Sequence, residues 1–274
     1  MARASVSPSQ APEKLRPVRF PRGTTIRAVW ALLMREMATN NARAFGGVLW
    51  AFLQPVLAIL FLTAIFSAGF KTPPVGTSFA LFYASGFLPF TMYAALASQL
   101  GTAVQGNRRL LTFPRITLLD AILARVIFTV LVQLIVTVAL YALILSIWDT
   151  KAHIVFAPLV LSLGLAVVLG IGVGCLNAYL FAVFPTYRLI WSILTQPLFL
   201  VSCIIFPYSA IPQPFDQWLW WNPLIHVVGV SRSGFYHRYD IHHVEVLYPL
   251  GVGAVTCILG LMLLSQGRGR LLRR

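Results

Sequence analysis

The stretch IVFAPLVLSLGLAVVLGIGVGCLNAYLFAV, residues 154–183, contains no charged side chain and exceeds the roughly 20 residues that a helix needs to cross ~30 Å of hydrocarbon. A helix satisfies its own backbone hydrogen bonds, which lipid cannot do. Five further apolar runs are near or above this length, at residues 48–68, 79–104, 121–147, 189–206 and 246–266. The sequence therefore predicts an all-α integral membrane protein with six transmembrane helices.

Composition supports this fold class and argues against a nucleic-acid-binding protein. Apolar residues make up 58% of the chain and charged residues 10%, values that an ordinary soluble domain does not show. The net charge of +14 comes from side chains that flank the apolar runs rather than from a basic face with interleaved aromatic residues. We therefore expect no nucleic acid among the partners.

The loop charges predict the orientation, because Lys and Arg side chains tend to remain on the cytoplasmic side of a membrane. Sixteen of them lie before the first run, between the second and third, between the fourth and fifth, or after the sixth. The loops on the other side hold four: Lys71, Lys151, Arg232 and Arg238. We predict a multi-pass protein with both termini in the cytoplasm and residues 45–274 as its membrane domain.

The region before the first run divides into two parts. Residues 1–23 combine four prolines with serines and basic residues, which favours a mobile cytoplasmic tail. In residues 24–44, Trp30, Leu33 and Met34 recur at helical spacing, while Arg35 and Glu36 point in other directions. We expect an amphipathic helix along the inner membrane surface with Trp30 in the interfacial layer. The alternative is a helix packed against other cytoplasmic protein.

Residues 105–120, QGNRRLLTFPRITLLD, form the cytoplasmic loop between the second and third runs. Its arginines face water, its leucines and Phe113 offer an apolar face, and Pro114 interrupts a continuous helix. Two interpretations stay open from these residues alone: a short helix that docks a cytoplasmic partner, or a plain solvated loop.

Residues 207–245 lie between the fifth and sixth runs and are unusually apolar for an external loop. We predict two short re-entrant helices that dip into the outer leaflet and turn near Asn222 and Pro223, where covering protein would protect their backbone. The alternative is a set of interfacial tryptophan anchors only. Within the fourth run, Gly170 and Gly174 form a small-xxx-small pair that permits close helix approach.

The ionisable residues indicate how transport could be driven. All seven acids lie in the tail, in loops or near the ends of the runs, so we predict no proton or sodium site at mid-membrane. Arg125 lies about one turn inside the third run and can reach back to the surface toward Asp120. Uphill transport would therefore need energy from another subunit.

The chain offers little enzymatic chemistry. No GxxxxGK[ST] loop occurs, so the chain itself cannot be the ATPase. His237, His242 and His243 lie near Asp240 and Glu245, but their spacing matches no strong ligand pattern. We predict neither a metal site nor a catalytic residue, and keep a membrane-embedded transferase that uses these histidines as the less favoured alternative.

Three stretches resemble the membrane subunit of type 2 ABC exporters, and in particular the capsular polysaccharide export permease of Gram-negative bacteria. They are MREMATNNARAFGGVLWAFLQPV at 34–56, QGNRRLLTFPR at 105–115 and VSCIIFPYSAIPQPFDQWLWWNPLIHVVGVSR at 201–232. The resemblance covers nearly all of the chain after the proline-rich tail. A permease for O-antigen or teichoic acid is the near alternative.

The resemblance implies a homodimer in the inner membrane, joined to two ATP-binding subunits that hold ATP and Mg²⁺, with no cofactor in this chain. It implies export of a lipid-linked acidic polysaccharide, with periplasmic adaptor and outer-membrane export proteins as further partners. By position, the ATPase-docking role falls on Asn107, Arg108, Arg109, Leu110, Leu111, Phe113, Pro114 and Arg115.

The resemblance also suggests where the polymer would enter and leave. The surface helix at 24–44 is similar to an entrance gate, where Trp30, Arg35 and Arg43 would meet the lipid end of the substrate. Ordinary positive-inside placement explains these arginines almost as well. Aromatic rings can stack on sugars, by analogy with bases, although an interfacial aromatic belt is an equal alternative. The candidates for the path or the outer gate are Tyr93, Tyr208, Phe215, Trp218, Trp220, Trp221, Asn222 and Pro223.

Overall fold

A computed structural model describes residues 29–36, 47–106, 117–148, 150, 152–237 and 239–273. All regular elements in these ranges are helices. Among the described residues, five helices are long and apolar enough to cross a membrane. They are α2 (Gly47–Gly69), α3 (Phe79–Gly106), α4 (Leu118–Ile147), α5 (Phe156–Val183) and α9 (Leu247–Arg273). They agree with five of the six predicted spans and confirm an all-α membrane fold.

The fifth predicted span, residues 189–206, corresponds to α6 (Tyr187–Val201), which has 15 residues. At 1.5 Å per residue this helix covers about 22 Å, less than the ~30 Å of a hydrocarbon core. The chain leaves the helix at Ser202, and Cys203 adopts a positive φ of 57°. The apolar run continues beyond this break, so hydropathy alone does not reveal it. That α6 crosses the membrane stays a prediction.

The helix α4 begins at Leu118, before the apolar run itself, because a capping box closes its first turn. The Thr117 hydroxyl accepts from the Asp120 amide at 3.2 Å, and the Asp120 carboxylate accepts from the Thr117 amide at 2.9 Å. Asp120 is therefore engaged at the helix start. The expectation that Arg125 would reach toward Asp120 is wrong, since Arg125 forms an ion pair with Glu36 instead.

The helix α5 occupies the centre of the bundle, and glycines allow close packing on two of its sides. A Cβ on Gly170 or Gly174 would lie 2.7 or 2.8 Å from side-chain atoms of α3, which confirms the predicted small-xxx-small contact. On another side, a Cβ on Gly172 would approach the Gly253 carbonyl oxygen of α9 to 2.3 Å. The fold therefore depends on close approach of α5 to both α3 and α9.

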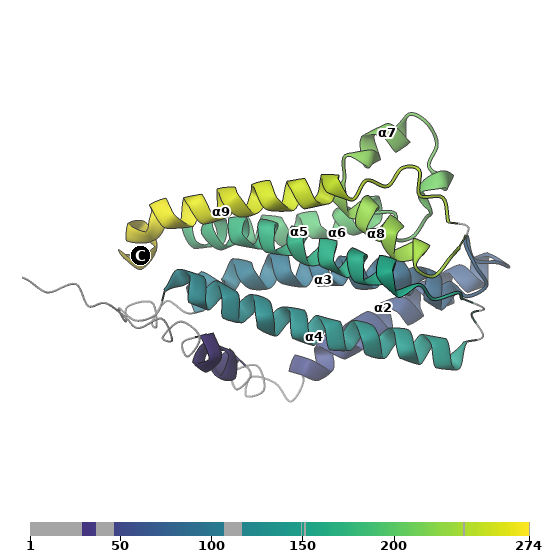
Figure 1. Cartoon of the computed structure of the whole chain (residues 1–274), viewed down its shortest axis with the longest axis horizontal. Helices are drawn as coiled ribbons and strands as arrows, with labels where there is room; N and C mark the ends of the chain where they lie inside the picture. Colours follow the sequence, from purple (N-terminus) through teal and green to yellow (C-terminus); the bar gives the residue numbers. More distant parts are fainter. Residues whose placement is uncertain are drawn as a thin grey trace, which may run out of the picture.

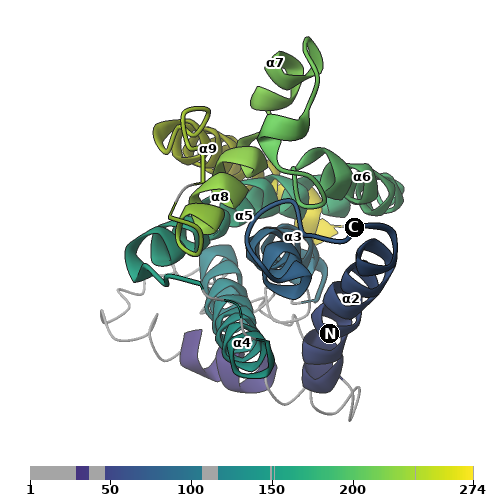
Figure 2. The ribbon, with the colours of Figure 1, turned by 90° about the vertical axis from the view of Figure 1, so that its right-hand side faces the viewer.

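Figure 1 shows the bundle lengthwise, with the helix at 29–36 and the C-terminus toward one end and α7 and α8 at the other. Viewed end-on, α3 lies between α2, α4, α5 and α8 (Figure 2). The helices α2 and α6 lie on the same side of α3. Few α2 side chains are buried inside the chain. The structure describes every residue of α6, and no α6 side chain is buried. These two helices therefore expose most of their apolar surface.

Residues 202–246, which we call the cap, contain a 3₁₀ turn (Tyr208–Ala210), α7 (Phe215–Trp220) and α8 (Pro223–Ser233). The predicted pair of short helices with a turn at Asn222 is present. Asn222 is the N-cap of α8 and its side chain accepts from the Leu224 amide at 3.1 Å. The α8 residues 224–232 are all buried, whereas α7 is largely exposed. Their depth in the outer leaflet stays a prediction.

The described part of the predicted surface helix, residues 29–36, is helical. Its inward-facing side chains are Leu32, Leu33 and Glu36, while Trp30 is 63% exposed. The face containing Trp30 is therefore free to meet lipid, but the expected outward direction of Glu36 is wrong. Glu36 is buried because it pairs with Arg125 of α4. The predicted tail at 1–23 lies outside the described residues.

Candidate functional site

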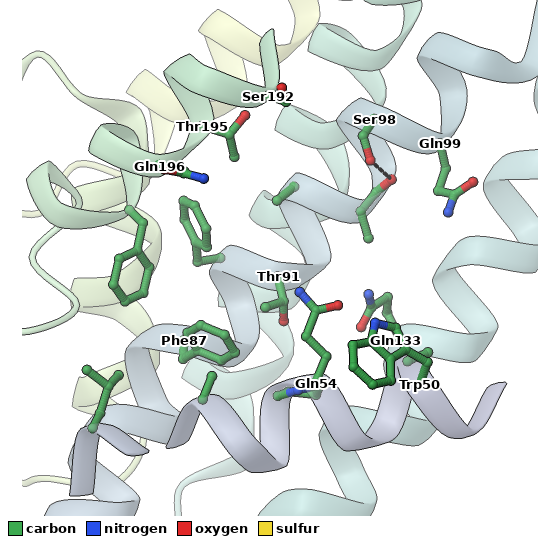
Figure 3. Close-up of a pocket in the computed structure, with 18 of the residues that line it drawn as sticks. Trp50, Gln54, Phe87, Thr91, Ser98, Gln99, Gln133, Ser192, Thr195 and Gln196 are labelled. Atoms are coloured by element: carbon green, nitrogen blue, oxygen red, sulfur yellow. Dashed lines mark hydrogen bonds between the residues drawn. The ribbon is translucent and has the colours of Figure 1, made fainter. Parts of the chain in front are cut away.

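A groove of about 790 Å³ runs between α2, α3 and α6, with a contribution from α4. Figure 3 shows Gln54 of α2 on one side, Thr195 and Gln196 of α6 on the other, and Thr91 of α3 between them. Two of its helices, α2 and α6, bury few side chains inside the chain, so the groove lies on an open side of the bundle.

Polar side chains without formal charge form one part of the groove lining. Glutamine amides offer both donors and acceptors, and hydroxyls can do the same. The serine and threonine hydroxyls of α3 also donate to their own helix: Thr91 to the Leu88 carbonyl at 2.8 Å and Ser98 to the Ala95 carbonyl at 3.4 Å. The polar lining residues are Gln54, Thr91, Ser98, Gln99, Gln133, Ser192, Thr195 and Gln196.

Aromatic rings from α2, α3 and α6 form a second part of the groove lining. The Phe199 ring meets Phe87 edge-on at 5.7 Å and Phe90 at 5.5 Å between centroids. This packing holds the α6 end of the groove against α3, because edge-to-face aromatic pairs are favourable beyond their buried area. The aromatic lining residues are Trp50, Phe61, Phe87, Phe90, Trp191 and Phe199.

Within the described chain, none of the groove-lining residues is ionisable. A surface of amides, hydroxyls and aromatic rings can contact the hydroxyls and the apolar ring faces of a sugar. It holds no fixed charge that would trap a charged group at one position. The chemistry of the groove therefore suits weak, repeated contacts with a neutral or hydrated polar chain.

Most predicted path residues lie away from this groove. Tyr93 is only 6% exposed and its ring lies 6.3 Å from that of Phe90, but it is not a lining residue. The remaining candidates are in the cap at one end of the bundle, where Pro223 takes the first position of α8. The structure thus places most of these candidates in an aromatic cluster at one end, apart from the mid-bundle groove.

Trp220 is the centre of that aromatic cluster. Its indole N–H donates to the His243 carbonyl at 3.1 Å, and its ring lies 5.2 Å from His226 and 5.3 Å from Tyr248. The Asn222 amide group donates to the Val201 carbonyl at 3.2 Å, which ties the cap to the end of α6. These contacts make Trp220 and Asn222 structural members of the cap.

Other predicted cap residues are exposed or form local contacts. Phe215, Trp218 and Trp221 are 61%, 77% and 68% exposed, which fits either a gate or an interfacial anchor. The Tyr208 hydroxyl donates to the Asp216 carbonyl at 2.9 Å, and its ring stacks on His243 at 4.1 Å between centroids.

The predicted histidine cluster is not assembled as a metal site. No group of three or more His, Cys, Asp or Glu side chains suited to a metal exists in the part of the chain that the structure describes. His243 stacks on Tyr208, while the His237 ring lies 6.5 Å from that of His153.

His226 has a defined tautomer within the cap. Its Nδ1 accepts from the Glu245 amide at 3.0 Å, so the proton is on Nε2, which lies 3.0 Å from the Trp220 carbonyl and donates to it. Burial lowers the pKa of His226 below its usual range, although the Trp220 carbonyl and Glu245 act in the opposite direction. The neutral imidazole therefore links Glu245, which lies just before α9, to α8.

Of the predicted entrance residues, Trp30 and Arg35 are described, on the helix toward the opposite end of the bundle. Arg35 donates to the Gly106 carbonyl at 3.2 Å, a contact that the sequence did not suggest, and Trp30 is exposed. Arg43 and the predicted docking residues Asn107–Arg115 lie outside the described residues. Their roles stay predictions.

The groove was not predicted from the sequence, although three glutamines in the apolar runs indicate it. Gln54, Gln99 and Gln133 interrupt or border apolar runs, and an amide in a transmembrane helix usually faces protein or a polar cavity. These residues are uncharged, so the pattern of ionisable side chains does not reveal them. Only the packing of α2, α3 and α4 brings them together.

Comparisons with known proteins place these features in context. The ABC-2 type transporter family matches residues 27–236. The polysialic acid transport protein KpsM of Escherichia coli is 31% identical over 239 residues, which cover 86% of this chain and 91% of that protein. The capsule polysaccharide export inner-membrane proteins CtrC of Neisseria meningitidis and BexB of Haemophilus influenzae are each 23% identical, over 88% of this chain and 91% of theirs.

Proposed function

The chain belongs to the ABC-2 type transporter family, and from this membership we propose that it is the membrane subunit of an ATP-driven exporter of capsular polysaccharide in the inner membrane. The relatives named for polysialic acid transport and capsule polysaccharide export match it over nearly their whole length. The chain itself is a transport permease, and hydrolysis of ATP with Mg²⁺ is assigned to a partner subunit. Residues 107–115 are assigned to dock that subunit.

The uncharged groove is the observation that carries this proposal in the structure. A glycan can place its ring faces against Trp50 and Trp191 and its hydroxyls against Gln54 and Gln196. Contacts of this kind are individually weak and recur along a polymer, so the chain can slide. Acidic groups on the polymer would stay hydrated within the passage, since no lining cation among the described residues holds them.

The open side of the groove supports a homodimer. Both α2 and α6 carry large exposed apolar side chains, such as Phe61 at 65% and Ile193 at 68%. A second copy placed against these helices would enclose the groove and shield the polymer from lipid. Periplasmic adaptor and outer-membrane export proteins are assigned as later partners in the same route, beyond the cap.

Filling the groove tests the proposal. Ala94 and Ser98 lie one turn apart on the α3 wall, so Ala94→Trp with Ser98→Trp should narrow the passage and lower the amount of surface polymer. The control, Ile258→Trp, adds the same side chain to an exposed α9 position, away from the lining and from the proposed dimer contact of α2 and α6. Both proteins should be present in the membrane in equal amounts, as measured by immunoblot.

Normal polymer export by the groove variant would refute the assignment of this passage. Sugar analysis of the polymer lost from the surface of a deletion strain separates the alternatives. Loss of capsule supports the proposal, whereas loss of O-antigen or teichoic acid with intact capsule would replace it with the near alternative.

A further inference from the structure

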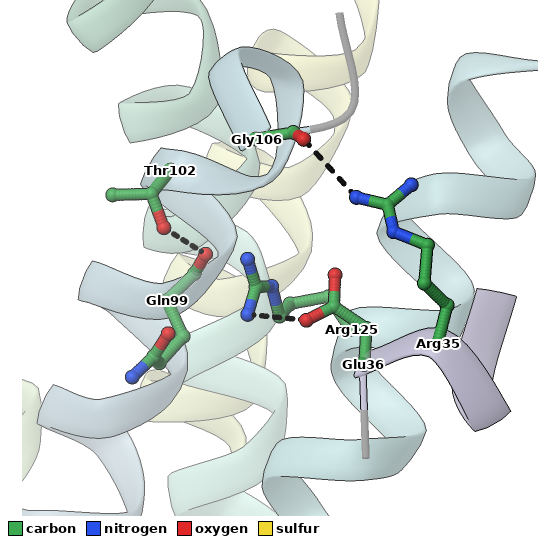
Figure 4. Close-up of polar contacts among 6 residues, drawn as sticks. All are labelled: Arg35, Glu36, Gln99, Thr102, Gly106 and Arg125. Carbon is green, nitrogen blue, oxygen red and sulfur yellow. Dashed lines mark hydrogen bonds and ion pairs between the residues drawn. The ribbon is translucent and has the colours of Figure 1, made fainter. Parts of the chain in front are cut away.

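One buried ion pair joins the surface helix to the membrane bundle. The Arg125 Nη1 and Glu36 Oε2 atoms lie 2.8 Å apart, and the two side chains are only 12% and 8% exposed (Figure 4). Breaking such a pair by removing one partner leaves an unpaired buried charge, which is strongly unfavourable. The pair therefore fixes the position of the helix at 29–36 against α4.

The same helix also contacts the end of α3. The neighbouring residue Arg35 donates to the carbonyl of Gly106, the last residue of α3, at 3.2 Å. A carbonyl in the last turn has no partner within its own helix and favours a cation. In addition, a Cβ placed on Gly106 would lie 3.6 Å from Arg125 Nη2, so the Arg125 guanidinium lies beside the α3 end as well.

The contacts of Arg35 and Glu36 lie on the two helices that precede and follow the segment assigned to ATPase docking. Gly106 directly precedes residues 107–116, and Thr117 follows them as the N-cap of α4. Arg125 lies about two turns into α4. Consecutive residues of the surface helix thus contact both helices that carry the docking segment, and a force applied to that segment reaches the surface helix through them.

The groove begins close to the same junction. Gln99 lines the groove and lies about two turns before Gly106 on α3 (Figure 4). The Thr102 hydroxyl donates to the Gln99 carbonyl at 2.9 Å within this last part of the helix. Displacement of the α3 end therefore acts on the surface helix and on the groove together.

We propose that Glu36 and Arg125 are positioning residues that make the surface helix at 29–36 move with the α3 and α4 ends when the ATPase acts, so that hydrolysis is coupled to polymer movement. This proposal rests on the function proposed above. An apolar contact could hold two helices together equally well. A charged pair adds a required register, because the helix can slide only if a buried charge loses its partner.

The first test measures coupling in the complete complex of the chain and its ATPase, reconstituted in vesicles with lipid-linked polymer. Glu36→Gln should lower the polymer moved per ATP by roughly 5-fold or more, the lower end of usual couplings between two sites, while complex assembly and ATP hydrolysis stay unchanged. The exchanged pair, Glu36→Arg with Arg125→Glu, should restore the ratio. Ala31→Gln changes an exposed residue of the same helix and should leave the ratio unchanged.

The outcomes separate coupling from simple support of the fold. If export and hydrolysis by Glu36→Gln fall together with the amount of assembled complex, the pair only stabilises the structure and the proposal is overturned. A normal ratio in Glu36→Gln overturns it too. Restoration by the exchanged pair, at normal assembly, supports it.

A second measurement does not depend on the polymer. Spin labels at Ala31→Cys on the surface helix and Leu123→Cys on α4 report their separation in the complex with and without an ATP analogue. The proposal predicts one narrow distribution of distances between the labels in both states and a broader distribution in Glu36→Gln. An unchanged distribution in Glu36→Gln overturns it. A wild-type complex that hydrolyses ATP but moves no polymer contradicts the proposed function alone, and this measurement then decides the inference.

Discussion

The close contact between α5 and α9 gives the most specific stability prediction. A Cβ on Gly260 would lie 2.5 Å from the Leu176 backbone nitrogen and 2.6 Å from the Cys175 carbonyl carbon. Carbon contacts are normally near 3.5–4.0 Å, so Gly260→Ala requires α9 to move about 1 Å from α5. The obstructing atoms belong to a helix backbone and cannot rotate away as a flexible side chain would.

Gly251 provides the matched control on the same helix. A Cβ there meets nothing within 4 Å. Both Gly→Ala changes gain helix propensity of about 1 kcal/mol, so this gain cancels in their comparison. The remaining difference is the cost of overpacking, typically about 1–3 kcal/mol. We therefore expect Gly260→Ala to be less stable than Gly251→Ala by this amount.

Thermal unfolding of the purified variants in one detergent measures the difference. A change of 1 kcal/mol shifts Tm by about 2–4 °C in chains of 150–250 residues, so Gly260→Ala should melt several degrees below Gly251→Ala. Gly251→Ala should melt at or above the unmodified protein. Equal melting temperatures for the two variants would show that α5 and α9 are not in close contact, and the central packing of the bundle would have to be revised.

Two further predictions concern the ends of the bundle. Burial holds the pKa of His226 below its ordinary value of about 6.5. Between the folded and unfolded pKa values, the unfolded chain therefore binds more protons than the folded chain. Stability should fall as the pH drops below about 6.5 and should level off below the folded pKa. His226→Gln should remove most of this loss in melting curves from about pH 7.5 to 5, and an unchanged pH profile would assign the loss to another group, such as His243. At the other end, Phe113→Asp or Leu110→Asp should abolish co-purification with the ATPase while the chain still inserts in the membrane, and export at the normal rate would count against docking at 107–115.

Sequence patterns predicted the features that depend on one helix at a time. The run at residues 154–183, which has no charged side chain, identifies α5, and the spacing of Gly170 and Gly174 indicated a close helix contact. The structure identifies the partner as α3. The Glu36–Arg125 pair could not be predicted in this way. Its partners lie on separate helices, and the charge pattern near Arg125 pointed to the nearer Asp120, which a capping box already engages.

The groove shows the same limit at the candidate site. Each of its glutamines is visible in the sequence, but a polar residue in an apolar helix can face a neighbour, a cavity or lipid headgroups. The aromatic residues of the 207–245 segment were predicted to line the path or the outer gate, and they lie close together in the sequence. In the structure, Trp220 instead packs within the cap against His226 and Tyr248.

By itself, the sequence determined that the chain is a helical membrane protein with no acidic residue near the middle of its apolar runs, because lipid imposes a composition on every spanning segment that can be read residue by residue. The tertiary structure decided that α6 stops at Val201, that Glu36 turns inward to Arg125, and that uncharged residues of α2, α3 and α6 share one groove. These features arise from contacts between distant segments. Their geometry depends on how closely the helices approach, which hydropathy and spacing do not encode.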